Sequence, residues 1–236
     1  MALLAALLAP LPALAGDIPL FLPYPKLDTN RWFVAHGWRN GSIQSCEWRK
    51  EAISVNDGNL LITLSDKGEK ISKISCGEVQ SKERFGYGMY SVRMRAASGS
   101  GLNSAFFTFI GPQHKQPHDE IDFEFLGKNP RKVQLNYYIN GKPQGETLID
   151  LGFDASKAMH EYSFVWEPER IRWYIDGKQV HETKKGAAIP THPGKIYLTL
   201  WSASPNVKDW LGPFEFTGDK DAEFSDVKFT PLPGTP

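Results

Sequence analysis

Short runs of alternating apolar and polar residues, separated by glycine, proline, asparagine and aspartate, recur along most of the chain. Alternation predicts β-strands, because successive side chains of a strand point to opposite faces of a sheet. No window of helical length has a 3.6-residue period, and only residues 155–160 are expected to form a helical turn. We therefore expect an all-β fold, a sandwich of two antiparallel sheets. The expected strands cover residues 59–64, 88–95, 104–110, 120–126, 133–139, 162–166, 171–175, 195–201 and 223–229.

The length and the charge of the chain limit how many domains and which kinds of partner we expect. The 236 residues contain no segment with the composition of a linker, so we expect one domain, residues 16–236, after a leader. The 27 basic residues equal the 27 acidic ones. This balance gives no electrostatic reason to expect a nucleic acid or an anionic membrane as partner. We expect a neutral or weakly charged partner.

The first fifteen residues are apolar and end in Ala13-Leu14-Ala15, the small-residue pattern of a signal-peptide cleavage site. A membrane anchor is the alternative, but it needs about 20 apolar residues, and this run is shorter and interrupted by Pro10 and Pro12. No basic residue precedes the run. We expect residues 1–15 to be a signal peptide and the mature protein to be secreted or periplasmic, with no membrane span.

The chain has two cysteines, Cys46 and Cys76. In an oxidising compartment they can form a disulfide only with each other, and two unpaired buried thiols are the alternative. No spacing of cysteine and histidine suggests a zinc site.

An acidic strand is the most informative segment for function. In His118-Asp-Glu-Ile-Asp-Phe-Glu-Phe-Leu-Gly127, the two-residue period of a strand places Glu120, Asp122 and Glu124 on one face. Three neighbouring carboxylates repel one another and gain nothing from packing. A retaining glycosidase, however, needs one ionised carboxylate as nucleophile and one protonated carboxyl as acid. A solvated sheet edge and a divalent-cation site are the two alternatives.

Sequence flanking the acidic strand resembles glycoside hydrolase family 16, in the branch of the bacterial lichenases and the rhizobial endoglycanases that trim succinoglycan. The core of the resemblance is Asp119-Glu-Ile-Asp-Phe-Glu-Phe-Leu-Gly-Lys128 followed by Lys132-Val-Gln-Leu-Asn-Tyr-Tyr-Ile-Asn-Gly141. The uninterrupted Glu-Ile-Asp-Phe-Glu spacing is that of lichenases, since laminarinase-like members carry one more residue. Further matching segments are Cys46–Arg49, Cys76–Glu78, Phe85–Tyr90, Leu151–Asp154 and Asp209–Gly212.

The resemblance implies a concanavalin A-like β-jelly-roll of two curved antiparallel sheets, with the glycan in a cleft across the concave sheet. It implies that Glu120 is the nucleophile, Asp122 an assisting carboxylate and Glu124 the general acid/base. It also supports the Cys46–Cys76 disulfide. Flat aromatic rings cover sugar faces and amides and carboxylates bond hydroxyls, which fits the substrate contacts that the resemblance implies. These contacts are Asn40, Glu78, Phe107, Tyr138, Trp201 and Trp210.

The family's structural calcium would be held here by Pro23 and Gly58, through their carbonyl groups, and by Asp226. No cofactor is expected for catalysis. Trp166 and Trp173 are expected in the core.

Two positions depart from the lichenase pattern. His118 stands where lichenases have tryptophan, and Gln80 where they have arginine. The His118 ring is expected either to contact a substituted sugar or to be a loop residue without a role. We expect a monomeric endo-acting retaining hydrolase of a β-1,3-1,4-glucan or of an exopolysaccharide such as succinoglycan, with a slight preference for the latter. A transglycosylase and a non-catalytic glycan-binding module are the alternatives.

Overall fold

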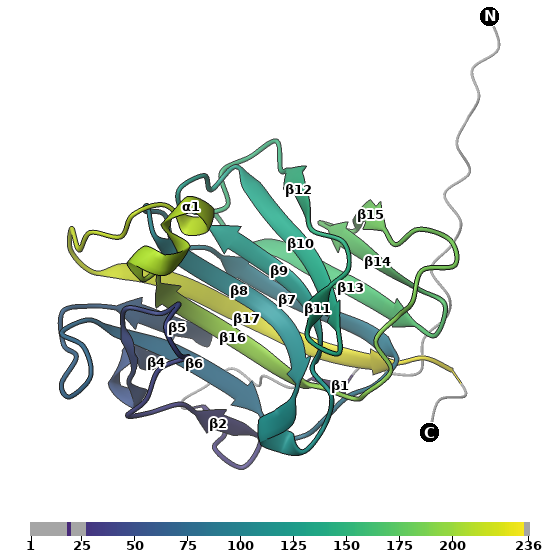
Figure 1. The fold of residues 1–236 in the computed structure, drawn as a ribbon, viewed down its shortest axis with the longest axis horizontal. Coiled ribbons are helices and arrows are strands. Elements are labelled where there is room, and N and C mark those ends of the chain that lie inside the picture. Colours follow the sequence, from purple (N-terminus) through teal and green to yellow (C-terminus); the bar gives the residue numbers. More distant parts are fainter. Residues whose placement is uncertain (1–17, 20–26, 234–236) are drawn as a thin grey trace, which may run out of the picture.

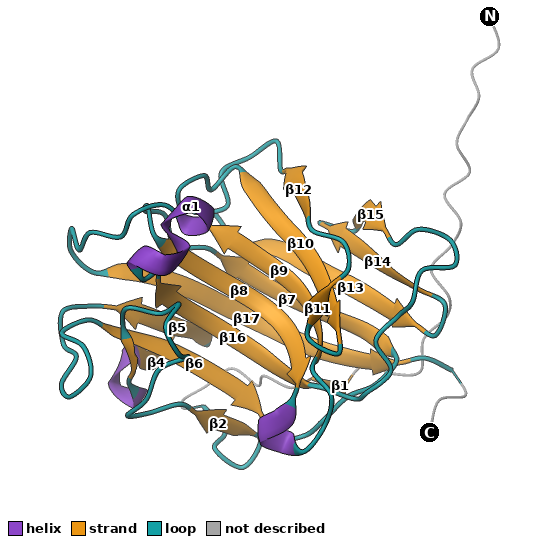
Figure 2. Ribbon diagram, viewed as in Figure 1, coloured by secondary structure: helices purple, strands orange, loops and turns teal. Residues whose placement is uncertain are grey.

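Two stacked antiparallel sheets form the molecule, as the sequence predicts, in a computed structural model that describes residues 18–19 and 27–233. Figure 1 shows the stacked sheets, and Figure 2 shows that helices occupy only short connections. These helices are η1 (Lys50–Ala52), η2 (Pro112–His114), η3 (Pro205–Val207) and α1 (Lys208–Leu211). Within the described residues, no helix is long and apolar enough to cross a membrane. The expected signal peptide lies outside the described residues.

The first sheet has nine strands. Along it lie, in order, β11 (Lys142–Pro143), β10 (Lys132–Ile139), β9 (Asp119–Leu126), β8 (Leu102–Ile110), β16 (Lys195–Ser202), β6 (Ser75–Ser81) and β2 (Trp32–Val34), while β12 (Thr147–Asp150) also pairs with β10 and β3 (Glu47–Trp48) with β6.

The second sheet has eight strands. Along it lie, in order, β15 (Lys178–Glu182), β14 (Arg170–Ile175), β13 (His160–Glu167), β7 (Gly88–Arg95), β17 (Lys220–Pro231), β5 (Asn59–Leu64) and β4 (Ile53–Asn56), while β1 (Ile18–Pro19) also pairs with β17. Sequence-distant strands are thus neighbours in both sheets, as in the expected jelly roll.

Aromatic side chains fill the space between the sheets. Phe106 from β8 stacks on Phe123 from β9 with ring centroids 6.4 Å apart, and lies 5.7 Å from Phe164 of β13 in the other sheet. All three are completely buried. Burying one such side chain contributes about 1.5 to 3 kcal/mol to the stability of the fold. This cluster therefore stabilises the packing of the two sheets against each other.

Trp166 and Trp173 belong to this core, as expected. They are 2% and 1% exposed. The Trp166 indole N–H donates to the Pro190 carbonyl at 2.9 Å, and that of Trp173 donates to the backbone carbonyl of Asp122 at 3.2 Å. The second bond ties the middle of the acidic strand to the opposite sheet.

The expected helical turn at residues 155–160 is wrong. Residues 155–157 form an isolated turn, and β13 already begins at His160. The Asp154 side chain accepts hydrogen bonds from the Ser156 backbone N–H at 2.9 Å and from its hydroxyl at 2.6 Å. Such a side-chain turn competes with helix formation.

Strand β6 escaped the sequence analysis. All seven of its residues are buried, on both faces, and two of them, Glu78 and Gln80, line a cleft. Its sequence, Ser-Cys-Gly-Glu-Val-Gln-Ser, therefore has no regular alternation of apolar and polar residues to detect.

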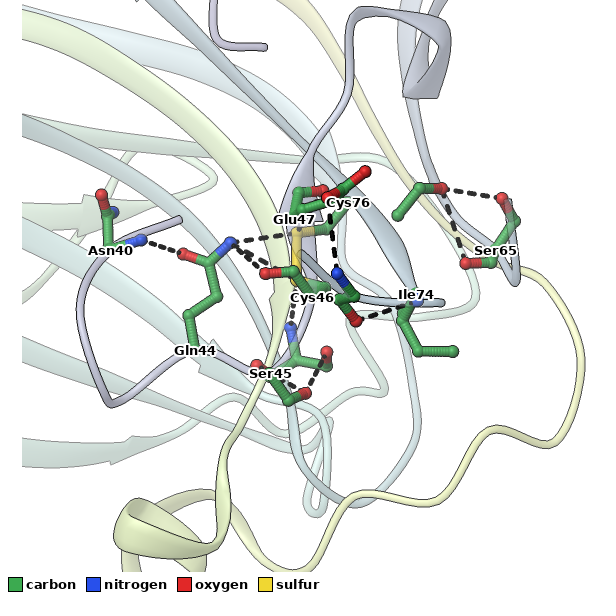
Figure 3. Close-up of a disulfide and its surroundings, with 11 residues drawn as sticks. Asn40, Gln44, Ser45, Cys46, Glu47, Ser65, Ile74 and Cys76 are labelled. Carbon is green, nitrogen blue, oxygen red and sulfur yellow. Dashed lines mark hydrogen bonds between the residues drawn. A yellow bond between two sulfur atoms is a disulfide. The ribbon is translucent and has the colours of Figure 1, made fainter. Parts of the chain in front are cut away.

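The predicted disulfide between Cys46 and Cys76 is present, with Cα atoms 5.8 Å apart. Figure 3 shows Gln44 beside it: the Gln44 amide nitrogen lies 3.2 Å from the Cys76 sulfur and donates to the Cys46 carbonyl at 3.2 Å. The Gln44 amide oxygen in turn accepts from the Asn40 backbone N–H at 3.0 Å. The disulfide thereby braces the loop that carries Asn40.

Replacing both cysteines by serine should lower the free energy of unfolding by about 3 to 4 kcal/mol, the loop-closure value for their separation of 30 residues. Denaturant titration of the variant and of the oxidised wild type measures the difference. Unchanged midpoints in the two titrations would contradict the expectation, and wild type with its disulfide reduced serves as the control.

Candidate active site

Strand β9 presents Glu120, Asp122 and Glu124 on the outer face of the nine-stranded sheet, because the apolar residues between and after them are buried in the core. Ile121, Phe123 and Phe125 are at most 1% exposed. The neighbouring strands set the surroundings of each carboxyl group. In register, Glu120 lies between Phe109 and Tyr138, Asp122 between Phe107 and Asn136, and Glu124 between Ala105 and Gln134.

A cleft of about 760 Å³ lies over this face of the sheet. This volume lies within the usual range of ligand-binding clefts. The structure brings together in its lining all ten of the catalytic and substrate-contact residues that the sequence suggested, namely Asn40, Glu78, Phe107, His118, Glu120, Asp122, Glu124, Tyr138, Trp201 and Trp210.

Glu124 is held by two amide groups. Asn103 donates its side-chain N–H to one carboxyl oxygen at 3.2 Å, and Gln134 donates to the other at 3.3 Å. Gln134 is itself oriented by the Trp210 indole N–H, 2.9 Å from its amide oxygen. Burial, followed by the negative charge of Glu120, raises the pKa of Glu124 to about 8, although the Asn103 hydrogen bond acts in the opposite direction. Glu124 is therefore protonated at neutral pH.

Asp122, in the middle of the row, is 2% exposed. Burial raises its pKa well above the usual range of an aspartate, and the charges of Glu120 and Glu124 and a hydrogen bond with Glu120 act in the same direction. Its Oδ2 atom has no hydrogen-bond partner among the described residues. A carboxyl group in this setting holds a proton, which it can share with Glu120.

Glu120 has a different environment. Its side chain is 19% exposed, and its Oε2 atom lies 2.6 Å from the Nε2 atom of His118. The three carboxyl groups of one strand face thus have three distinct environments, which is what separate acid and nucleophile roles require.

Glu78, from β6, is a fourth acid in the cleft, and it is 2% exposed. Gln80 donates its amide N–H to the Glu78 carboxyl group at 2.6 Å. Burial raises the pKa of Glu78 to about 7, while hydrogen bonds from Gln80 and Asn40 partly oppose the shift. Gln80, one of the two departures from the lichenase pattern, therefore contacts Glu78 directly in the cleft.

Aromatic rings supply the apolar part of the lining. Trp201 and Trp210 lie 6.1 Å apart, and Phe107 stacks on Tyr197 with centroids 4.9 Å apart. The sequence analysis missed Trp38, Phe109 and Tyr197, which also line the cleft. Alternation could have found Phe109, two residues beyond Phe107, and Tyr197, four residues before Trp201. Trp38 lies in a loop and has no such signal.

Two of the three expected calcium ligands can be located. Gly58 lies in the turn between β4 and β5 with φ of 81°, and Asp226 has φ of 50° at an irregularity of β17. The pairing of Phe224 with Leu60 brings Asp226 toward this turn. Pro23 lies outside the described residues. Within the described part of the chain, no group of three His, Cys, Asp or Glu side chains, those of β9 included, is arranged to hold a metal ion.

Comparison with known proteins settles the family. Residues 40–220 match the model of the glycosyl hydrolases family 16. The chain belongs to this family, and it is a glycosidase. With the relatives described below, the family assignment makes this chain an endo-acting glucan hydrolase, which fits a cleft lined by carboxyl groups.

Two curated relatives cover most of the chain. It is 46% identical to the endo-1,3-1,4-beta-glycanase ExoK of Rhizobium meliloti over 207 residues, 88% of this chain and 77% of that protein. It is 42% identical to the beta-glucanase of Paenibacillus macerans over 219 residues, 92% of this chain and 90% of that protein.

Solved structures agree with this assignment. The Bacillus licheniformis beta-glucanase and a prokaryotic beta-1,3-1,4-glucanase (lichenase) from a mouse hindgut metagenome each superpose with a TM-score of 0.83 at 38% identity. Each alignment covers 92% of this chain and 98% of the solved one. The fold is thus the jelly roll of the lichenases.

If Glu124 acts as the general acid, kcat/KM for a β-glucan should fall as the pH rises through about 8, because the proton on Glu124 is then lost. Replacing Asn103 by alanine removes a hydrogen bond that stabilises the ionised form of Glu124. The fall in kcat/KM should therefore move to higher pH. The pH profile of kcat/KM for the two proteins measures both effects. A fall in kcat/KM between pH 5 and 6 would contradict the assignment of Glu124 as the general acid.

Proposed function

We propose that this protein hydrolyses internal β-linkages of a β-1,3-1,4-linked glycan with retention of anomeric configuration. The observation that carries the proposal is the row of three carboxyl groups at the cleft floor, in which Glu124 has a pKa of about 8 while Glu120 remains partly exposed to the cleft. A protonated acid beside an accessible carboxylate is the pair that double displacement needs.

In this mechanism Glu124 donates its proton to the glycosidic oxygen while a carboxylate oxygen of Glu120 forms a bond to the anomeric carbon. The bond from that carbon to the leaving oxygen breaks, and a glycosyl-enzyme ester results. Glu124, now ionised, then takes a proton from water as the water attacks the same carbon and releases Glu120. Asp122 shares its proton with Glu120 and limits the build-up of negative charge along the strand.

The substrate proposal is a glycan with mixed β-1,3 and β-1,4 linkages, and among these a bacterial exopolysaccharide of the succinoglycan type in preference to cereal β-glucan. The relatives named as 1,3-1,4-glycanase and as beta-glucanase support the linkage type. His118 and Gln80 support the preference, because both replace larger or charged side chains of lichenases in the cleft.

The direct test is an assay of new reducing ends on barley β-glucan, lichenan, laminarin and succinoglycan, together with the solution viscosity. The wild type should cleave a mixed-linkage polymer with a rapid fall in viscosity. Glu120→Gln should lower the rate by about 10³-fold or more, because it removes the nucleophile. Binding of polymers by both proteins without any cleavage would identify a glycan-binding module instead.

Product analysis distinguishes the remaining alternatives. Proton NMR of early products should show the β-anomer first, since two inversions give retention. Products longer than the starting oligosaccharide would identify transglycosylation.

A structural calcium ion forms a second part of the proposal. The Asp226 carboxylate and the Gly58 carbonyl provide oxygen ligands of the kind that calcium prefers, and the strand pairing of β5 with β17 supports their proximity. The ion would brace the β4–β5 turn against β17, far from the chemistry.

Calcium at about 100 times its dissociation constant should raise the free energy of unfolding by about 2 to 3 kcal/mol. Asp226→Asn should abolish this gain, and neither EDTA nor the substitution should change kcat at a temperature where the protein stays folded. Thermal unfolding with calcium, with magnesium as the control ion, provides the measurement. Equal stabilisation of the wild type and the variant would exclude the site.

We also propose that residues 1–15 are removed as a signal peptide, and that residues 16–236 act as a secreted or periplasmic monomer. The disulfide supports export, because such bonds persist in oxidising compartments.

A further inference from the structure

The His118 ring lies against the proposed nucleophile rather than free in the cleft. Its Nε2 atom is 2.6 Å from Oε2 of Glu120, and the two side chains are 30% and 19% exposed. An ionised carboxylate only accepts hydrogen bonds, so His118 is the donor when Glu120 is ready to react. A hydrogen bond to a charged group is stronger than one between neutral groups.

Neighbouring groups fix the ring of His118 in this position. It stacks on Tyr138 with ring centroids 5.3 Å apart and an interplanar angle of 15°, and Phe109 meets it edge-on at 4.9 Å. The Gly141 backbone N–H donates to the His118 carbonyl at 2.9 Å. At Gly141 the backbone has φ of 75°, and an added Cβ would come within 3.4 Å of the imidazole Nδ1 atom.

The next residue anchors the chain at the same point. Asp119 is 4% exposed, and its carboxylate accepts hydrogen bonds from the backbone N–H groups of Asn140, Thr191 and His192. The His192 ring adds a contact at 2.8 Å. The segment that carries His118 therefore has little freedom to shift, and a rigidly supported donor can hold a reactive group in place.

We propose that His118 is a positioning residue for Glu120, an inference that rests on the proposed function. Its hydrogen bond occupies Oε2, so the other carboxylate oxygen, Oε1, would be the atom that attacks the anomeric carbon. Without this bond, Asp122 would be the remaining polar partner on one side and solvent would lie on the other, so the carboxylate could rotate away from the attacking geometry. Misplacement of a reacting group by about 1 Å can cost about 10²-fold in rate.

Two substitutions separate the hydrogen bond from the ring packing. His118→Phe keeps an aromatic ring on Tyr138 but removes the donor, and it should lower kcat about 10- to 100-fold with little change in KM. His118→Gln keeps an amide N–H near the position of Nε2, and it should recover kcat to within about 5-fold of the wild type.

The chain offers a matched control in the other sheet. His160 lies 2.7 Å from Asp176 and stacks on Phe153 with centroids 3.6 Å apart, so it makes the same kind of carboxylate pair and ring contact. It does not line the cleft. His160→Phe should leave kcat and KM unchanged, while thermal unfolding of all three variants establishes that they fold.

The step affected can be isolated with an aryl β-glycoside that has a dinitrophenolate leaving group. This group needs no proton from Glu124, so the burst of dinitrophenolate reports attack by Glu120 alone. His118→Phe should slow the burst by the same factor by which it lowers kcat for the polysaccharide. A raised KM with normal kcat would overturn the proposal and assign His118 to the sugar. A normal kcat for His118→Phe together with a reduced kcat for His118→Gln would also overturn it and assign the ring to packing.

Glu120→Gln distinguishes failure of this inference from failure of the proposed function. If Glu120→Gln is active, the nucleophile assignment itself is wrong. If it is inactive and His118→Phe reacts normally, only the positioning role of His118 is excluded.

Discussion

The pairing of β9 between β8 and β10 is the constraint on which the rest of the site depends. Because Ile121, Phe123 and Phe125 are fixed in the core, the carboxyl groups between them cannot leave the cleft face. The Trp173 indole donates a hydrogen bond to the Asp122 backbone carbonyl and so connects β9 to the second sheet. A shift by one residue would place three acids in the core, at a cost that no hydrogen bond there could offset.

The core packing of β9 stabilises a row of carboxyl groups that is unfavourable by itself. Burial and mutual repulsion favour the protonated forms of Asp122 and Glu124, which destabilises the fold as the pH rises above the usual range of carboxyl groups. The aromatic core between the sheets offsets that cost. What the enzyme gains is an acid, Glu124, that keeps its proton at neutral pH beside a second carboxyl group, Glu120, that is partly exposed to the cleft.

Several features of the site could be predicted from sequence because they depend on local spacing. Alternation in β9 predicts which carboxyl groups share a face, and resemblance to the family predicts which distant side chains line the cleft. Strand β6 and the turn at residues 155–157 could not be predicted, since burial on both faces hides alternation and a side-chain turn can replace a helical one. Trp38 likewise has no periodic signal.

The sequence by itself determined the all-β class, the acidic face of one strand and the identity of the only cysteine pair. The tertiary structure decided what each carboxyl group can do, through residues from other strands: Asn103 and Gln134 at Glu124, and His118 at Glu120. The reason is physical. A strand period depends on residues two positions apart, whereas a pKa and a hydrogen bond depend on burial and on partners that only the folded sheets bring together.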